Sequence, residues 1–521
     1  MKLPCDRSTE SVTRLNRRTV VGLLGSAAAV GMSGLQAAAA PAPKRGGLLR
    51  MGISGASTTD SLDPATYSST YMQCLGLQIF DTLTEISPAG EVLPALCESW
   101  SASSNASQWN LKIRSGVQFH NGRELSASDV VFSLDHHRKK DSTSGAKSYF
   151  SDITDIKTVS PREVQISMTN GNADLPYLLA DYHLCIMQSG ESTASGMGTG
   201  PYVLGRFQPG VTAATTRNKN YWRNDRGWVD AVETTAINDD SARISALLSG
   251  SVDLINRADP KVANRLESNP MIRLHSISGG GHYYFVMRCD TPPFDNLDVR
   301  LALKYAIDRN EQMSKILNGR GKVGYDNPIP SMSPFFADDI DRHDFDPDKA
   351  RFHAKKGGLD TPIELTLANV AFPGAIDAGI LFKEQAAKSG IAINVKQVPD
   401  DGYWSETWMK AAFCGSYSGG RVTPDLVFSL NYKSDAAWNE TFWKRPHFDE
   451  VLIQARTELD QGKRKGLYRE LQQMVVTDGG VIIPMFNNFL DVGSNRLEGF
   501  VPNPYIEMSG GRAAASVWFA D

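Results

Sequence analysis

The sequence of 521 residues is poor in cysteine, and its cysteines show no spacing that indicates a metal or redox site. None of the six forms a C-x-x-C pair or a zinc-finger pattern. Without the first 40 residues five remain, so at least one would be unpaired within the chain. A disulfide between Cys74 and Cys97 and a set of buried free thiols are both consistent with this count.

Motifs of the common enzymes are missing as well. The sequence has no G-x-S-x-G nucleophile turn, no H-E-x-x-H zinc motif, no phosphate-binding loop and no dinucleotide fingerprint after a strand. His136 and His137 are adjacent on a predicted helix, where neighbouring side chains diverge by about 100° and do not easily share a metal. We therefore expect no catalytic residues, no metal site and no cofactor.

The chain also lacks a strongly basic segment. Its formal net charge is -4, and beyond residue 40 it has no basic tract for nucleic acid or anionic lipid. The same part has no apolar run long enough to cross a bilayer. We therefore expect a soluble protein without a nucleic-acid partner, long enough for more than one domain.

The N-terminal stretch "RLNRRTVVGLLGSAAAVGMSGLQAAAA" has the pattern of an export signal. Arg17 and Arg18 precede an apolar stretch of about eighteen residues, and an Ala-rich exit follows near Ala37. We predict that residues 1–40 are a signal peptide that is cleaved, and the paired arginines favour the twin-arginine route. A Sec signal with two adjacent arginines is the alternative. No cysteine follows the leader, so we expect a periplasmic protein without a lipid anchor.

Periodic patterns in the rest of the chain predict a mixed α/β fold. Alternation over residues 108–119 predicts a hairpin of two short strands, with a buried face formed by Trp109, Leu111, Ile113, Val117 and Phe119. Ser126, three residues before Asp129, resembles a capped helix start. Apolar spacing over 297–317 predicts two helices or one long broken helix, and two further helical faces precede the apolar strand "VIIPMF".

Several aromatic residues stand in polar or glycine-rich surroundings, where a packed core explains them incompletely. Tyr67 and Tyr71 enclose "YSSTY" with Ser69, and His282 and Tyr283 follow three glycines. Trp404 lies in "DGYWSETWMK", and Trp438 lies in "DAAWNETFW". Such rings are suited to line a ligand cleft, because they offer a large flat area and a polar edge. Half-buried packing aromatics are the alternative for each of them.

The stretch "ALCESWSASSNASQWNLKIRSGVQFHNGRELSASDVVFSLDHH" resembles a long segment of the extracytoplasmic solute-binding proteins of family 5, which serve peptide, nickel and opine ABC importers. Further blocks resemble the family in the same order: "SLDPATYSSTY", "GTGPY", "NKNYW", "LLSGSVDL", "PPFDNLDVRLALKYAIDR" and "WKRPHFDEVLIQARTELDQGKRKGLYRELQQ". The resemblance covers essentially the whole chain after the leader.

This resemblance implies an α/β fold of the two-lobed periplasmic binding protein type II (cluster C), with three domains. Domain I would be discontinuous, formed by residues 41–86, 199–285 and 486–521, with domain II at 87–198 and domain III at 286–485. "GTGPY" would be a crossing between lobes, so we predict a hinge at Gly198, Gly200 and Pro201. An ordinary tight turn into a strand is the alternative.

The resemblance also bears on the ligand. In dipeptide-binding members, an aspartate after a glycine-containing loop holds the amino group of the ligand, and a tryptophan lies about twenty residues earlier. Trp404 matches that tryptophan, but the acidic position falls on glycine and then Arg421, and Asp425 matches a second acid only loosely. Arg288 replaces the usual asparagine of another strand end. These departures favour a ligand with an anionic group, because arginine pairs well with carboxylate or phosphate.

We therefore predict a monomeric periplasmic binding protein that captures a peptide-like or opine-like solute by lobe closure and delivers it to the permease subunits of an ABC importer. The predicted ligand-binding residues are Tyr67, Ser69, Tyr71, His282, Tyr283, Trp404, Arg421, Asp425 and Trp438. Three alternatives stay open: a secreted hydrolase with an unrecognised catalytic site, a binding protein for a nickel chelate, and a receptor or chaperone that does not serve import.

Overall fold

A large mixed sheet runs through the computed structural model, which describes residues 42–458 and 460–520. The predicted signal peptide, residues 1–40, lies outside the described residues. Eleven described strands form this sheet, and short β13 (Gly321–Val323) pairs with β17 beside the main path. The other ten lie in the order β15 (Ile393–Gln397), β14 (Ile363–Leu367), β16 (Phe413–Ser418), β12 (Ile272–Met287), β17 (Val481–Ser494), β11 (Leu254–Ile255), β1 (Leu48–Ile53), β10 (Ala231–Ala236), β9 (Thr212–Arg217) and β8 (Tyr202–Gln208).

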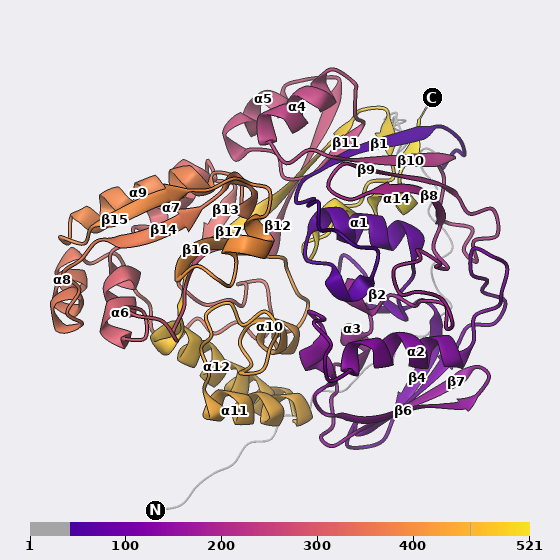
Figure 1. The fold of residues 1–521 in the computed structure, drawn as a ribbon, viewed down its shortest axis with the longest axis horizontal. Helices are drawn as coiled ribbons and strands as arrows, with labels where there is room; N and C mark the ends of the chain where they lie inside the picture. Colours follow the sequence, from indigo (N-terminus) through magenta and orange to yellow (C-terminus); the bar gives the residue numbers. More distant parts are fainter. Residues whose placement is uncertain (1–41, 459, 521) are drawn as a thin grey trace, which may run out of the picture. The chain divides into compact units, whose positions relative to one another are not determined.

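The two longest strands, β12 and β17, join the two halves of this sheet (Figure 1). They run antiparallel, and β12 lies next to β16 on one side while β17 lies next to β11 on the other. Their register shifts between Ser278 and His282, where three glycines occur. A Cβ on Gly279 would lie 2.5 Å from the carbonyl oxygen of Pro504, so the close approach of these segments requires glycine.

Helices cover the half of the sheet that contains β14–β16 (Figure 1). They are α6 (Leu297–Tyr305), α7 (Arg309–Ile316), α8 (Pro347–Lys356) and α9 (Ala375–Ala387). Residues 297–317 thus form a helical pair rather than one broken helix, because Asp308 caps α7 by accepting a hydrogen bond of 3.0 Å from the Glu311 amide. Their apolar faces and the strands share one buried core.

A second group of helices follows β16 along the chain: α10 (Pro424–Asn431), α11 (Pro446–Thr457) and α12 (Gln461–Asp478). The predicted apolar face of α11 is confirmed, because Phe448, Val451, Leu452 and Ala455 are buried in one core with α12. Strand β17 begins directly after Gly479 and Gly480, as the pattern "DGG" before "VIIPMF" predicts.

A separate antiparallel sheet contains β4 (Cys97–Ala102), β5 (Gln108–Ile113), β7 (Glu163–Met168) and β6 (Ile153–Ser160), in that order. The alternating burial of β5 is confirmed, but the predicted hairpin is wrong. β5 pairs with β4 and β7, and residues 117–119 form no strand, because the chain turns at Gly116 and the Phe119 amide bonds the Arg123 carbonyl. Helix α2 (Ala127–Arg138) begins at the predicted Ser126–Asp129 cap.

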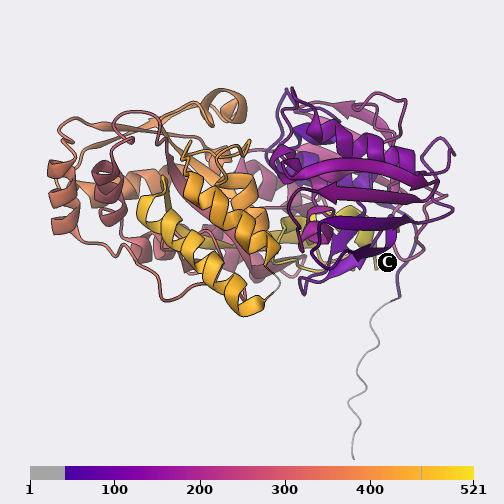
Figure 2. The same cartoon turned by 90° about the horizontal axis from the view of Figure 1, so that it is seen from below.

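The small sheet and helices α10–α12 lie side by side at the lower edge of the molecule in Figure 1 and face the viewer in Figure 2. Hydrogen bonds connect the segment before β6 to these helices, for example from the Ser148 hydroxyl to the Ser429 carbonyl at 2.7 Å. The remaining α-helices and strands of the described residues are α1 (Thr70–Ile79), β2 (Thr84–Ile86), β3 (Val92–Pro94), α3 (Leu175–Leu178), α4 (Asp240–Leu248), α5 (Ala263–Glu267), β18 (Leu497–Glu498), α13 (Glu507–Gly510), α14 (Ala513–Ser516) and β19 (Trp518–Phe519).

The segment predicted as a hinge packs tightly against the end of α1. A Cβ on Gly198 would lie 2.1 Å from the carbonyl oxygen of Ile79, and the Gly200 amide donates to the same carbonyl at 2.8 Å. Pro201 leads directly into β8. Close packing therefore accounts for both glycines, and their role as a hinge stays a prediction, as do the predicted domain boundaries.

Candidate functional site

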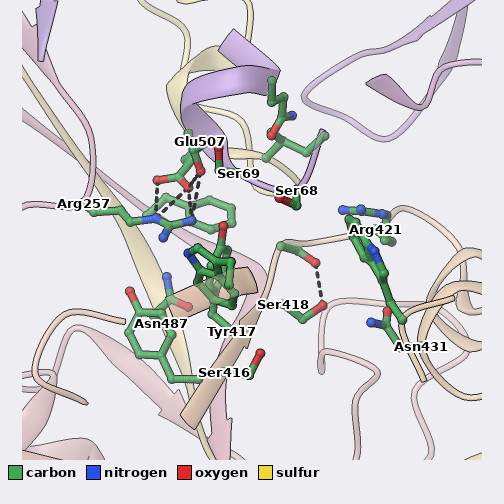
Figure 3. A pocket seen from close by; sticks show the side chains of 18 of the residues that line it. Ser68, Ser69, Arg257, Ser416, Tyr417, Ser418, Arg421, Asn431, Asn487 and Glu507 are labelled. Carbon is green, nitrogen blue, oxygen red and sulfur yellow. Dashed lines mark hydrogen bonds and ion pairs between the residues drawn. The ribbon is translucent and has the colours of Figure 1, made fainter. Parts of the chain in front are cut away.

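A cavity lies beside the end of β16 and the middle of β17 (Figure 3). It contains about 970 Å³ of empty space, counting its open mouth. Its other walls come from the first turn of α1, the segment after β11, the end of α10, the loop that follows α10 and the start of α13. A concave site with aromatic walls and a few charged groups is typical of small-molecule binding.

Five of the predicted ligand-binding residues line this cavity: Ser69, Tyr283, Trp404, Arg421 and Trp438. They come from α1, β12, the loop before β16, the loop after it and the loop after α10. Ser69 also caps α1, because its hydroxyl accepts a hydrogen bond of 3.3 Å from the Met72 amide. The fold therefore brings together residues that are up to 369 positions apart, between Ser69 and Trp438.

The other four predicted residues do not line this cavity. Tyr67 and Tyr71 are buried in the core around α1, where their hydroxyls donate to the carbonyls of Leu62 and Thr234. His282 is buried against the Phe486 ring, with ring centroids 4.9 Å apart. Asp425 is fully buried and accepts a hydrogen bond of 2.9 Å from Arg456. Their positions are thus explained by packing and by an ion pair.

Arg421 is a largely buried cation, with its side chain 10% exposed, and it has few partners among the described residues. Its Nη1 donates to the Gly420 carbonyl at 3.1 Å, while its Nε has no hydrogen bond within the described part of the chain. The nearest carboxylate oxygen is Asp181 Oδ2, 3.9 Å from Nε, and the Tyr182 ring centroid is 5.6 Å away. Burial alone would lower the pKa of Arg421, but Tyr182 and Asp181 raise it above its usual value. The guanidinium therefore stays charged with donors left for a ligand.

On the other side of the end of β16, Arg257 forms an ion pair with Glu507 (Figure 3). Its Nε donates to both carboxylate oxygens of Glu507, at 2.8 and 3.1 Å, and its Nη2 donates to the Thr70 hydroxyl at 2.9 Å. The guanidinium also lies over the Tyr417 ring, 3.9 Å from the centroid. Its charge is thus compensated within the protein, so Arg421 is the better candidate for an anionic ligand group.

Three tryptophans line another part of the cavity. Trp408 lies between Trp404 and Trp438 in edge-to-face contacts, with ring centroids 5.8 and 6.0 Å apart. We call these three residues the tryptophan wall. Trp408 was visible in the same sequence stretch as Trp404, but nothing local showed that both rings would meet Trp438.

Glu440 is a cavity residue that the sequence analysis missed. Its Oε1 accepts a hydrogen bond of 2.8 Å from the Tyr284 hydroxyl, whereas Oε2 has no hydrogen-bond partner among residues 42–458 and 460–520. Burial raises the pKa of Glu440 to about 7, and Tyr284, Ser416 and Trp408 beside it partly oppose this rise. A signal existed in the sequence, because an acidic residue stands between the tryptophans of "WNETFW". Arg257 and Glu507 had no comparable signal.

The outer edge of β16 is open where it borders the cavity. Strand β12 pairs with β16 from Phe413 to Ser418, but β14 pairs with it only at Cys414. The backbone N–H and C=O groups of a strand point alternately toward its two edges. Every second residue after Cys414 therefore directs these groups away from β12. Residues 416–419 line the cavity there, and the Gly419 carbonyl accepts a hydrogen bond of 3.1 Å from the Ser418 hydroxyl. A strand edge of this kind can pair with an extended ligand.

The described part of the chain shows no group of three His, Cys, Asp or Glu side chains arranged to hold a metal ion. The five cysteines in this part are free thiols, and four of them are buried, including Cys74 and Cys97. Of the two alternatives for the cysteines, the structure therefore shows free thiols. No helix among residues 42–458 and 460–520 has the length and apolar character needed to traverse a bilayer.

Comparison with known proteins gives a consistent picture. A family model described as bacterial extracellular solute-binding proteins, family 5, middle part, matches residues 91–454. A relative, the di/tripeptide-binding protein 1 of Pseudomonas aeruginosa, is 26% identical over 502 residues, covering 86% of this chain and 92% of that protein.

Solved structures show the same fold. The periplasmic binding protein DppA of Helicobacter pylori, in complex with the peptide STSA, has a TM-score of 0.83 at 20% identity, covering 92% of this chain and 99% of that one. AgaA of A. tumefaciens R10, in complex with agropinic acid, has a TM-score of 0.83 at 20% identity, covering 91% and 99%. The predicted α/β fold of a periplasmic binding protein is confirmed.

Proposed function

The chain belongs to the bacterial extracellular solute-binding proteins of family 5, and we propose that it captures a small peptide-like or opine-like solute for an ABC importer. In this proposal residues 1–40 direct export to the periplasm and are cleaved. The mature protein is a monomer that hands its ligand unchanged to permease subunits in the inner membrane. Relatives named for di/tripeptides, and a structural neighbour solved with agropinic acid, support this ligand class.

We propose that the ligand binds in the cavity beside β16 and that the lobes close on it. One lobe contains domains I and II, and the other contains domain III (286–485). The predicted hinge at Gly198, Gly200 and Pro201 lies where the chain passes from domain II into domain I. The cavity has walls from all three predicted domains, since Ser69, Tyr182 and Arg421 all line it. A movement of domain III would therefore open and close it.

The single observation that carries the proposal is the state of Arg421. A largely buried guanidinium with five N–H groups lies at the cavity, with one hydrogen bond from Nη1 and, among the described residues, no partner for Nε. Leaving such donors unpaired costs free energy, and a carboxylate or phosphate of the ligand would satisfy them. The open edge of β16 supports an extended, peptide-like backbone next to this anionic group.

A ligand screen tests the proposal. Purified mature protein is screened by thermal shift against dipeptides, tripeptides, opines, amino-acid conjugates and nickel chelates, and hits are measured by calorimetry. We expect saturable binding of an anionic peptide-like or opine-like compound, recovery of that compound unchanged, and a more compact scattering profile with ligand bound. Consumption of the ligand, or tight binding without any change in the scattering profile, would contradict the proposed role or the closure.

A further inference from the structure

The tryptophan wall (Trp404, Trp408 and Trp438) presents aromatic surface to one part of the cavity. The rings meet edge to face at interplanar angles of 77° and 75°, so they do not stack flat on one another. None of the three is fully buried. Indole rings have the strongest attraction for a cation among the aromatic side chains, because their faces carry negative potential.

The carboxyl group of Glu440 also lines the cavity. Glu440 is 6% exposed, and none of the described residues makes a hydrogen bond to its Oε2. The Trp408 indole N–H and the Ser416 hydroxyl lie beside the carboxyl, yet neither makes a well-formed hydrogen bond to it. The described side chains that shift the pKa of Glu440 are Tyr284, Ser416 and Trp408, and none of them is cationic. A buried acid without a cationic partner is costly unless a ligand supplies the partner.

We propose that the tryptophan wall and Glu440 together bind an organic cation of the ligand, such as an alkylated ammonium or a guanidinium group. The wall supplies the ring faces, and Glu440 supplies the counter-charge with its free Oε2. This inference rests on the proposed function and narrows its substrate class: the solute carries a cationic group here and an anionic group at Arg421.

The other charged groups of the cavity agree with this assignment. Arg257 is neutralised by Glu507 and already occupies one face of Tyr417, so that ring is not counted in the cation site. Arg421 has only a loose pair with Asp181, at 3.9 Å, and it repels a cation placed next to it. A ligand with both charges, held at separate positions, satisfies Arg421 and Glu440 at the same time.

Two matched probes test the proposal. The first is N-acetylalanyl-trimethyllysine, which has no free amino terminus, and the second is its carbon isostere, in which a tert-butyl group replaces the trimethylammonium group. Both have the same shape, but only the first has the side-chain charge. We expect the wild-type protein to bind the cationic probe at least about tenfold more tightly in calorimetry at pH 8, because a ring wall and a carboxylate act together.

The variants Glu440→Gln and Trp408→Leu should reduce this preference to less than about threefold. Glu406→Gln is the matched control, because Glu406 belongs to the same aromatic-rich part of the chain, is exposed and does not line the cavity. It should keep the full preference. Circular dichroism and the thermal midpoint without ligand establish that each variant is folded.

The outcomes separate this inference from the proposed function. Equal binding of both probes, tighter binding of the isostere, or a preference that survives Glu440→Gln would each overturn the cation site while leaving solute binding intact. A preference lost in Glu440→Gln and retained in Glu406→Gln would support the site. If neither probe nor any compound of the wider screen binds, the proposed function itself fails, and this inference fails with it.

Discussion

The guanidinium of Arg456 donates a hydrogen bond of 2.7 Å from Nη1 to Asp152 Oδ2, and so connects two parts of the chain that are 304 residues apart. The same group donates from Nε to Asp425 at 2.9 Å and from Nη2 to Ser429 at 2.6 Å. The side chains of the ion pair are only 2% and 13% exposed. Since Asp152 lies in predicted domain II and Arg456 in predicted domain III, the pair connects the parts that lobe opening would separate.

We predict that Asp152→Asn favours the open form. The substitution removes one charge-assisted contact, and such a contact contributes about 1–3 kcal/mol. Arg456 keeps Asp425 as its partner, so the fold of domain III should persist. Ligand affinity should fall several-fold with a faster dissociation rate, measured by calorimetry and stopped-flow.

Asp155→Asn is the matched control for this variant, because Asp155 is exposed on the neighbouring strand β6. Its affinity should equal that of the wild type. If Asp152→Asn binds as tightly as this control, the Arg456 pair does not stabilise a closed form.

Arg421→Ala should weaken binding of the anionic ligand by well over tenfold. The loss of a charge-assisted contact at a buried site costs about 2–5 kcal/mol. Arg421→Lys should lie between the wild type and the alanine variant, because an ammonium keeps the charge but not the planar fork. Calorimetry with the best ligand of the screen measures both.

Arg469→Ala is the control for Arg421, because Arg469 is exposed, pairs with Asp339 at 2.8 Å and does not line the cavity. It should bind as the wild type does. Strong binding of ordinary zwitterionic dipeptides that Arg421→Ala leaves unchanged would refute the anion site.

The sequence was informative where the signal was local. The alternation of Trp109, Leu111 and Ile113 predicts the buried face of β5, and the spacing from Phe448 to Ala455 predicts the buried face of α11. Both patterns follow from the geometry of a single strand or helix. The strands that pair with β5 could not be predicted from such a local pattern, because its partner β7 lies about fifty residues later in the chain.

The site was harder to predict, because its residues come from many separate segments. Aromatic residues in polar loops indicate Trp404 and Trp438 correctly as cavity residues, but the same argument fails for Tyr71. The hydroxyl of Tyr71 finds its partner 163 residues away, at Thr234, and no local pattern shows this. Glu440 and Arg257 likewise become cavity residues only through the packing of distant segments.

The predicted export route has its own test, although its residues lie outside the described part of the chain. Replacing Arg17 and Arg18 by lysine should leave precursor in the cytoplasm if the twin-arginine route is obligatory. Cell fractionation with detection of precursor and mature protein measures this. Normal periplasmic accumulation of the double variant would instead assign the leader to the Sec route.

The last prediction concerns the pH dependence of stability that Glu440 causes. Burial raises the pKa of its carboxyl from 4.5 to about 7. A carboxyl with a raised pKa binds its proton more tightly in the folded state, so stability is lost as pH rises from about 4.5 to 7. Tyr284, Tyr403, Tyr432 and Cys414 surround this carboxyl, and their raised pKa values keep them neutral below pH 8.

Glu440→Gln should therefore raise the free energy of unfolding at pH 8 by on the order of 2–3 kcal/mol without ligand, and leave it almost unchanged at pH 4. Urea unfolding at both pH values measures the difference, with Glu406→Gln as the control that should show none. A bound cation would compensate the charge of the wild-type carboxylate, so saturating cationic ligand should remove the advantage of the variant at pH 8. An equal effect of Glu440→Gln at pH 4 and pH 8 would show that the carboxyl is not titrating in the folded protein, and that its free Oε2 is not a site of negative charge.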